Sequence, residues 1–228
     1  YKRITNQYTG VLTGKGLSFG GSLARTEATG YGLIYFVECM LAKKGQDFKG
    51  KTAIISGDGN VAQYAAEKLL QLGGKPITLS DSTGYILDEE GITAEKLAYV
   101  KEFRARKEKV DAYVKKYPNA KFFKGEKPWG VKADLALPCA TQDEIYLEDA
   151  KKLVVNGCML VAEGANMPTR AEAIKYFQEN KVMFAPGKAA NAGGVAVSGL
   201  EMSQNSERLS WTFEEVDSKL KQIMTNIH

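Results

Sequence analysis

Residues 51–62 constrain the fold more strongly than any other part of the chain. An apolar run at residues 52–55 is followed at once by Gly57 and Gly59, and residues 61–72 carry apolar side chains at helical spacing. A strand, a glycine turn and a helix in this order are the setting in which the pattern G-x-G-x-x-G/A binds a dinucleotide. Gly57 permits the tight turn, Gly59 lets the backbone approach a pyrophosphate, and Ala62 is small enough for the helix to pack on the strand. The N–H groups at the start of that helix would face the phosphates.

Strands and helices alternate along the rest of the chain. The apolar patterns predict strands at residues 52–55, 76–79, 122–123, 133–137, 159–162 and 182–185. They predict helices at residues 26–44, 61–72, 93–117, 141–152 and 169–180, then two helices from residue 189 onward, with a break near 206–210 and the second at 211–227. This alternation predicts an α/β fold with a Rossmann-like, doubly wound, mostly parallel sheet and helices on both faces.

The first 25 residues are dense in glycine and threonine. This composition indicates either an ordered loop whose backbone approaches a ligand or a flexible leader. The chain also starts at Tyr1, without a methionine and inside polar sequence. We interpret this start as that of an excised domain, although proteolytic processing would produce the same start.

Composition argues against several kinds of function. The net charge is only +4, and the most basic stretch, residues 101–109, also contains Glu102 and Glu108, so it is typical of a solvated helix face rather than a nucleic-acid surface. The one histidine, His228, argues against His-based catalysis and against a multi-histidine metal site. The three cysteines lack metal-ligand spacing and predict reduced thiols in the cytoplasm, with no metal site. No signal peptide or membrane-length apolar run is present, so we expect no membrane partner.

Polar or glycine-rich turns follow the predicted strands. In a doubly wound sheet, ligands bind beyond the carboxyl ends of the strands. Each turn alone has a structural explanation, but together they predict a dinucleotide site at one edge of the sheet. The turns lie at residues 57–60, 80–82, 138–141, 163–168 and 186–191.

The second turn leaves the choice of cofactor open. Asp81 lies near the position at which an acidic residue binds the adenosine ribose hydroxyls, which favours NAD. The neighbouring hydroxyl groups would instead suit the 2′-phosphate of NADP, and three basic residues are candidate cations for it. The hydroxyl side chains are Ser80, Ser82 and Thr83, and the basic residues are Lys101, Arg104 and Lys107.

Taken together, these segments closely resemble the nucleotide-binding domain of the hexameric glutamate dehydrogenases. The similarity covers nearly the whole chain, and the segments occur in the order of that family. The matching segments are residues 12–16, 20–22, 25–32, 57–62, 138–142, 163–169 and 189–205.

The resemblance implies roles for particular residues. Thr29 resembles the threonine at the nicotinamide carboxamide, and Ser198 resembles the serine that binds the γ-carboxylate of the substrate. Thr13 and Val195 resemble residues that lie against the substrate carbon chain. The implied cofactor-binding residues are Thr29, Gly57, Gly59, Asn60, Val61, Asp81, Ser82, Ala140, Thr141, Asn166 and Asn191. Residues 80–82 resemble the NADP-using members, so we expect NADP, with NAD as the alternative.

The resemblance also implies what lies outside these 228 residues. The lysine that acts as general base, its partner aspartate and the lysines that hold the substrate carboxylates belong to an N-terminal domain in this family. We therefore expect residues 1–228 to be the C-terminal, dinucleotide-binding domain of a larger enzyme, with no catalytic residue of its own. The whole enzyme would be a homohexamer that interconverts L-glutamate with 2-oxoglutarate and ammonia, whereas this part would bind the cofactor without turnover.

Two alternatives remain. A dehydrogenase of leucine or phenylalanine would share the fold, but the hydroxyl of Ser198 suits a γ-carboxylate better than an apolar side chain. A free-standing module that senses dinucleotides would need no second domain. Residues 1–25 and 187–205 argue against the sensor, because they resemble active-site walls.

Overall fold

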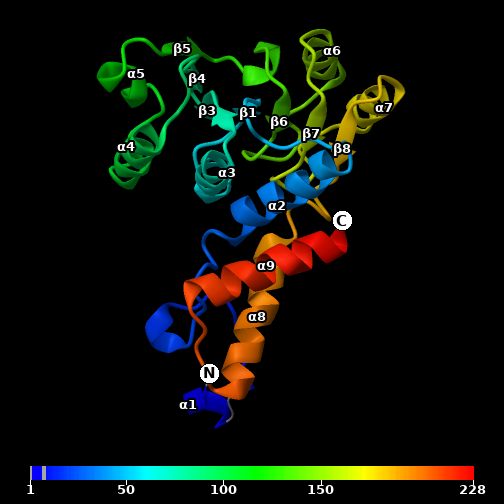
Figure 1. Ribbon diagram of the computed structural model, residues 1–228. Helices are drawn as coiled ribbons and strands as arrows, with labels where there is room; N and C mark the ends of the chain where they lie inside the picture. The colour runs from blue at the N-terminus through cyan, green and yellow to red at the C-terminus, as the bar shows by residue number, and fades with distance from the viewer. Residues whose placement is uncertain (1, 7–8) are drawn as a thin grey trace.

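The computed structural model describes residues 2–6 and 9–228; the parts of the glycine-rich leader at residues 1, 7 and 8 lie outside the described residues. Its centre is a five-stranded, wholly parallel sheet in the order β2-β1-β6-β7-β8 (Figure 1). The strands are β1 (Thr52–Ile55), β2 (Lys75–Pro76), β6 (Leu135–Leu137), β7 (Leu160–Ala162) and β8 (Met183–Ala185). The α/β, doubly wound fold expected from the sequence is confirmed.

Helices cover both faces of this sheet because side chains alternate between the faces along each strand. Ala53 and Ile55 of β1 enter one hydrophobic core, and Ile54 between them enters the other. The first core packs against α2 (Ala28–Ala42), α3 (Asn60–Gln71) and α9 (Phe213–Ile227). The second core packs against α6 (Leu147–Val155) and α7 (Ala171–Glu179). Both faces of the strands are therefore apolar, as a buried parallel sheet requires.

A second, antiparallel sheet was not anticipated. It has the order β3-β4-β5, with β3 (Thr78–Asp81), β4 (Gly84–Leu87) and β5 (Lys121–Lys124). The single strand expected at residues 76–79 is divided between β2 and β3, and the strand expected at 122–123 pairs with β4 instead of joining the parallel sheet. A two-residue turn, with Gly84 at a φ of 147°, lets the chain reverse directly after Asp81.

Two predicted helices differ from the structure. The helix expected at residues 93–117 is two helices, α4 (Ala94–Ala105) and α5 (Ala112–Lys116). Lys107, at a φ of 60°, ends the first, and the N–H of Val110 donates to Asp81 at 3.0 Å, which draws the connection to the end of β3. The helix expected at 141–152 begins only at Leu147, because residues 143–145 bond instead to the loop after β7: the N–H of Glu144 donates to the carbonyl of Pro168 at 2.7 Å.

The final helices meet the first long helix at close range. α8 (Gly193–Glu207) crosses α2 where a Cβ atom on Gly32 would come within 2.8 Å of the Cα of Gly193, so both positions need glycine. α8 points away from the parallel sheet, and the N-terminal segment lies beside it (Figure 1). That segment holds α1 (Lys2–Thr5) and the 3-10 turn η1 (Leu17–Phe19); a second such turn, η2 (Pro128–Gly130), precedes β6. No helix within residues 2–6 and 9–228 is long and apolar enough to cross a membrane.

Candidate cofactor and substrate site

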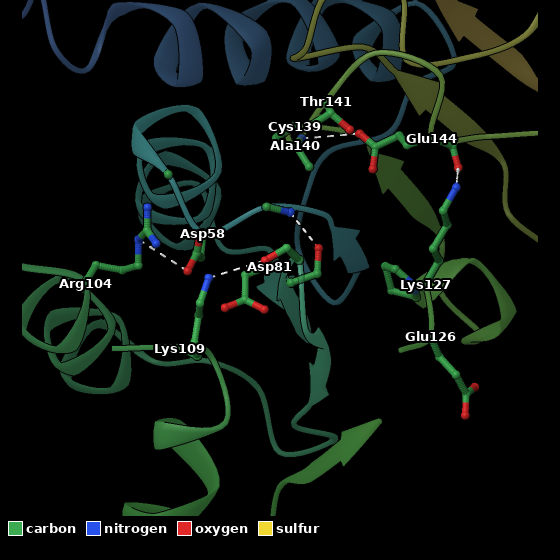
Figure 2. A pocket seen from close by; sticks show the side chains of 15 residues that line it. Asp58, Asp81, Arg104, Lys109, Glu126, Lys127, Cys139, Ala140, Thr141 and Glu144 are labelled. Carbon is green, nitrogen blue, oxygen red and sulfur yellow. Dashed lines mark hydrogen bonds and ion pairs between the residues drawn. The ribbon is translucent and has the colours of Figure 1, made fainter. Parts of the chain in front are cut away.

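The turns that follow β1, β3 and β6 surround a cavity of about 520 Å³, here called the fingerprint cavity (Figure 2). A second cavity, of about 650 Å³, lies between the turns after β6, β7 and β8 and the helices α2 and α8, and is called the α2–α8 cavity. Cys139, Ala140 and Thr141 line both cavities, which makes them adjoining parts of one groove. Cavities of this size at the carboxyl ends of parallel strands are typical of dinucleotide sites.

The two glycines of the fingerprint differ in backbone conformation and in their surroundings. Gly57 has a φ of 84°, and a Cβ atom there would lie 3.0 Å from the carbonyl oxygen of Cys139. Gly59 precedes the first turn of α3, and a Cβ atom on it would meet nothing within 4 Å. The open space beside Gly59 is where a pyrophosphate would approach the backbone, so this turn fits the cofactor. Ala62 is fully buried, and Asn60 and Val61 begin the helix.

Asp58, between the two glycines, is buried and faces the fingerprint cavity. Burial raises the pKa of its carboxyl to about 6, despite the opposing effect of the Arg104 guanidinium. Its Oδ2 lies 3.3 Å from Nε of Arg104, within ion-pair distance but without a hydrogen bond. Asp58 was not assigned a role from the sequence, since the fingerprint pattern leaves its position free.

Asp81 is engaged by its own chain. Its Oδ1 accepts hydrogen bonds from the N–H and the hydroxyl of Thr83, at 2.7 and 2.5 Å, and its Oδ2 accepts from the N–H of Val110. These bonds outweigh partial burial and lower the pKa of the Asp81 carboxyl, so it is ionised. Ser82 beside it is exposed and accepts a hydrogen bond from Nζ of Lys109 at 3.3 Å.

The cations around the fingerprint cavity differ in part from those named from the sequence. Arg104 and Lys109 line it, as does Lys127 (Figure 2). Lys101 instead pairs with Glu67 at 2.5 Å. Lys107 is not among the described residues that line the cavity. Lys109 was not predicted because it lies in the connection between α4 and α5, where the sequence predicts a continuous helix.

The α2–α8 cavity brings together residues expected at the nicotinamide and ribose, one from the pyrophosphate turn (Val61) and one expected against the substrate carbon chain (Val195). Thr29, Val61, Asn166, Asn191 and Val195 line it, along with Ala140 and Thr141. Nδ2 of Asn191 donates to Oδ1 of Asn166 at 2.8 Å, which joins the turns after β7 and β8. The structure therefore places these residues in one groove although they come from five separate parts of the chain.

Two buried carboxylates support the walls of this groove. Glu163 accepts hydrogen bonds from the N–H groups of Gly187 and Thr169, at 2.6 and 3.2 Å, and so holds the turns after β7 and β8 together. Glu144 accepts from the N–H of Ala140 at 3.2 Å beneath the turn after β6. Burial raises the pKa of the Glu144 carboxyl. Neither role was predicted from the sequence: that of Glu163 depends on a contact between two turns 24 residues apart, and that of Glu144 on how the turn after β6 folds back on itself.

Of the three substrate residues that the resemblance implied, Val195 lines the α2–α8 cavity, whereas Ser198 and Thr13 are not among the described residues that line it. Ser198 accepts a hydrogen bond from Nε of Arg25 at 3.1 Å, and Arg25 also lines the α2–α8 cavity. Val195, one helical turn before Ser198, is exposed at that cavity. Thr13 does not line it, but the N–H of the next residue, Gly14, is bonded to α8. Arg25 belongs to the matching segment 25–32, but the resemblance implied no role for it. It is the only cationic side chain among the described residues that line this cavity.

The side chains that line the α2–α8 cavity are mostly amides, hydroxyls and small apolar groups. No group of three or more His, Cys, Asp or Glu side chains within residues 2–6 and 9–228 is arranged to hold a metal ion. Lysine, aspartate and glutamate are absent from the described residues that line the α2–α8 cavity. This part of the groove can hold and orient a ligand through amides, hydroxyls and one guanidinium.

Comparison with known proteins agrees with this geometry. The chain is 60% identical to the NAD(P)-specific glutamate dehydrogenase of Xylanibacter ruminicola and 54% identical to the NADP-specific glutamate dehydrogenase of Escherichia coli; each alignment covers 100% of this chain and 51% of the relative. The crystal structure of Plasmodium falciparum glutamate dehydrogenase superimposes with a TM-score of 0.97 at 51% identity, over 100% of this chain and 49% of that one. The chain thus spans about half the length of the relatives that it matches. The profile of the glutamate/leucine/phenylalanine/valine dehydrogenases matches residues 20–228, and the chain belongs to that family.

Proposed function

We propose that this chain is the C-terminal, dinucleotide-binding domain of a glutamate dehydrogenase. The whole enzyme would catalyse the reversible oxidative deamination of L-glutamate to 2-oxoglutarate and ammonia. The observation that carries this proposal is one groove that has the open backbone of Gly59 in one part and, in the other, Arg25, whose Nε donates to Ser198. One part suits a pyrophosphate and the other suits a carboxylate. The names of the relatives support the same activity.

The Arg25–Ser198 pair favours glutamate over leucine or phenylalanine as the substrate. A guanidinium with further N–H donors next to a hydroxyl recognises a side-chain carboxylate, whereas an apolar side chain would leave both groups without partners. Leaving such polar groups unpaired is the strongest means of discrimination available to a binding site. Thr13 and Val195 would contact the carbon chain between the two carboxylates.

The fingerprint cavity favours NADP over NAD. Both carboxylate oxygens of Asp81 already accept hydrogen bonds from the chain, so this side chain is turned toward Thr83 and Val110. Ser82, Lys109 and Arg104 remain at the cavity to receive a 2′-phosphate. NAD stays the alternative, because the carboxylates of Asp58 and Asp81 line the same cavity and would oppose a second negative charge.

The described residues would contribute orientation rather than proton transfer. The nicotinamide ring supplies hydride chemistry at the substrate Cα when the cofactor is bound. Thr29, Asn166 and Asn191 would hold the amide and ribose groups at that end, and the N-terminus of α3 would face the phosphates. The general base and the other carboxylate-binding groups would come from an N-terminal substrate domain beyond these residues.

The proposal extends to the cellular compartment and the oligomeric state of the whole enzyme. We place it in the cytoplasm, in agreement with the three free thiols at Cys39, Cys139 and Cys158. We propose a homohexamer for the whole enzyme, which light scattering of the full-length protein tests; nucleic acids and membranes are not among the proposed partners.

The function is tested with the 228-residue chain and with the full-length protein that contains it. Calorimetry of the chain should show binding of NADPH, and tighter binding of NADH would overturn the cofactor assignment. The full-length protein should oxidise L-glutamate in preference to L-leucine and L-phenylalanine, and the chain alone should not. A reading frame that provides no lysine-bearing substrate domain upstream would instead favour a dinucleotide sensor.

A further inference from the structure

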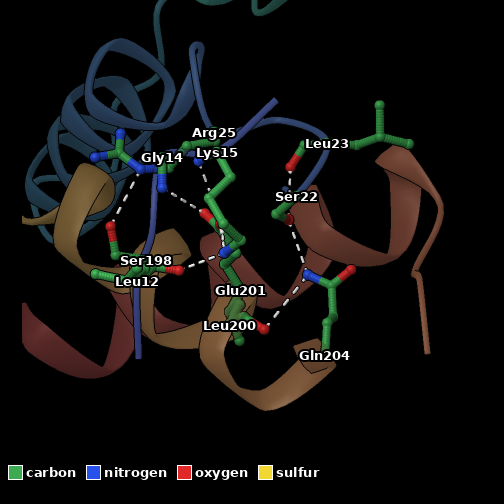
Figure 3. Close-up of polar contacts among 10 residues, drawn as sticks. All are labelled: Leu12, Gly14, Lys15, Ser22, Leu23, Arg25, Ser198, Leu200, Glu201 and Gln204. Atoms are coloured by element: carbon green, nitrogen blue, oxygen red, sulfur yellow. Dashed lines mark hydrogen bonds and ion pairs between the residues drawn. The ribbon is translucent and has the colours of Figure 1, made fainter. Parts of the chain in front are cut away.

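Helix α8 presents three polar side chains to the segment that precedes α2. Ser198, Glu201 and Gln204 follow one another at a spacing of three residues, which places them on one face of the helix (Figure 3). Ser198 accepts from Arg25, and Nε2 of Gln204 donates to the hydroxyl of Ser22 at 2.8 Å. Glu201 lies between them and is fully buried.

The carboxylate of Glu201 is bound by the turn that carries Thr13. Its Oε2 accepts a hydrogen bond from the N–H of Gly14 at 2.8 Å. Its Oε1 accepts from the N–H of Lys15 at 3.4 Å and forms an ion pair with Nζ of Lys15 at 2.6 Å. Nζ of Lys15 also donates to the carbonyl of Leu12, which closes the turn around Thr13 (Figure 3).

These contacts favour the charged form of Glu201 although the side chain is buried. Burial by itself would raise the pKa of the Glu201 carboxyl, but the hydrogen bonds from Lys15 and Gly14 outweigh burial, so its pKa is lowered and the group is charged. Hydrogen bonds to a buried charge are shorter and stronger than those between neutral groups. A buried carboxylate without its partners would carry a large desolvation cost. The turn therefore stabilises the charge of Glu201, and Glu201 in return stabilises the position of the turn.

We propose that Glu201 is a positioning residue for the substrate wall, the surface formed by Thr13, Val195 and Ser198. It holds the turn that bears Thr13 at a fixed place on the helix that bears Ser198 and Val195, so that both sides of the dicarboxylate pocket move as one unit. The inference rests on the proposed function, because the roles of Thr13 and Ser198 belong to it. Glu201 itself does not line either cavity.

Glu201→Gln in the full-length protein is the direct test. The amide has the same shape, but it carries no charge for Lys15 and places its own N–H groups against N–H donors of the turn. We expect the KM for glutamate to rise about tenfold or more, with the KM for NADPH unchanged, since only the substrate wall loosens. Glu201→Asp retains the charge and should recover part of the loss. An unchanged KM for glutamate in a folded Glu201→Gln variant would overturn the proposal.

Two further variants keep the result decisive. Gln204→Leu removes a buried polar contact on the same face of α8 without touching the Thr13 turn. It should lower thermal stability and leave the KM for glutamate unchanged. A rise in KM equal to that of Glu201→Gln would mean that general loosening of α8, and not the loss of Glu201, alters the pocket.

Lys15→Met tests the same turn from a partly exposed position if Glu201→Gln does not fold. This variant should also raise the KM for glutamate, and an unchanged KM would refute the inference. Failure of the proposed function is distinct, because the unaltered enzyme would then not oxidise glutamate.

Discussion

The backbone N–H of Gly57 donates a hydrogen bond of 2.8 Å to the hydroxyl of Ser80. The N–H of Ser80 donates back to the carbonyl of Gly57 at 3.1 Å. This reciprocal pair joins the fingerprint turn after β1 to β3 of the antiparallel sheet. The position of the turn therefore depends on the second sheet as well as on the strand that leads into it.

Gly57→Ala should lower the stability of the fold, whereas Gly59→Ala should weaken cofactor binding. At Gly57 a Cβ atom is strained by the left-handed backbone and crowded by Cys139 and Ala140, so we expect unfolding in urea to become easier by about 1–3 kcal/mol. Gly59 has a φ of −81° and free space around it, so its alanine variant should keep its stability but bind NADPH more weakly by calorimetry. Unimpaired binding to a Gly59→Ala variant would show that no phosphate approaches this backbone.

Asp58 should make stability fall as pH rises. Its folded pKa of about 6 lies above the ordinary value of 3.8, so the native state keeps the proton to higher pH than the unfolded state does. The resulting stabilisation is complete below the ordinary pKa and is lost as pH rises through the folded pKa; across this window the chain should lose about 3 kcal/mol relative to Asp58→Asn. Urea unfolding of both proteins across that window measures the difference.

Asp81→Asn is the matched control for this pH dependence. The folded pKa of Asp81 is lowered, so its contribution is present at neutral pH and is lost as pH falls through the folded pKa. The difference between the chain and this variant should therefore change with pH in the opposite direction. Equal slopes for the two variants would contradict the burial of Asp58.

Lys109 should discriminate between the two cofactors. We expect Lys109→Gln to weaken NADPH binding by about 1.5–3 kcal/mol, the value of a hydrogen bond to a charged group, and to leave NADH binding nearly unchanged. Lys101→Gln provides the control, because Lys101 is paired with Glu67 and lies outside the fingerprint cavity. Calorimetry with both cofactors checks the result, and equal losses for NADPH and NADH would remove Lys109 from the 2′-phosphate site.

Replacing Arg25 should lower the activity toward glutamate and leave the affinity for the cofactor unchanged. In the full-length protein, Arg25→Leu removes the charge beside Ser198, and we expect kcat/KM for glutamate to fall by about 100-fold or more, because a buried carboxylate loses its partner. Calorimetry should give the same NADPH affinity as for the unaltered protein. A fall for leucine as large as the fall for glutamate would show that Arg25 does not recognise the side-chain carboxylate.

Local patterns in the sequence predicted the parallel strands, the fingerprint turn and most of the helices. Residues 52–62 illustrate why: buried strands are short apolar runs, and a turn with a positive φ needs glycine, so neighbouring residues alone carry the signal. Family resemblance supplied the residues around the α2–α8 cavity, and the structure places most of them along it. The roles of these residues remain proposals.

What the sequence determined by itself was the α/β class, the dinucleotide turn and the membership of segments in a common site. Only the tertiary structure decided that β4 forms, that the predicted helix breaks after α4, that Asp81 bonds to Thr83 and Val110, and that Arg25 contacts Ser198 and Glu201 contacts the turn at Gly14. Arg25 and Ser198 are 173 residues apart in the chain, and Gly14 and Glu201 are 187 apart. Such pairs leave no periodic trace in a sequence, because a hydrogen bond depends on where folding brings two groups and not on the residues beside them.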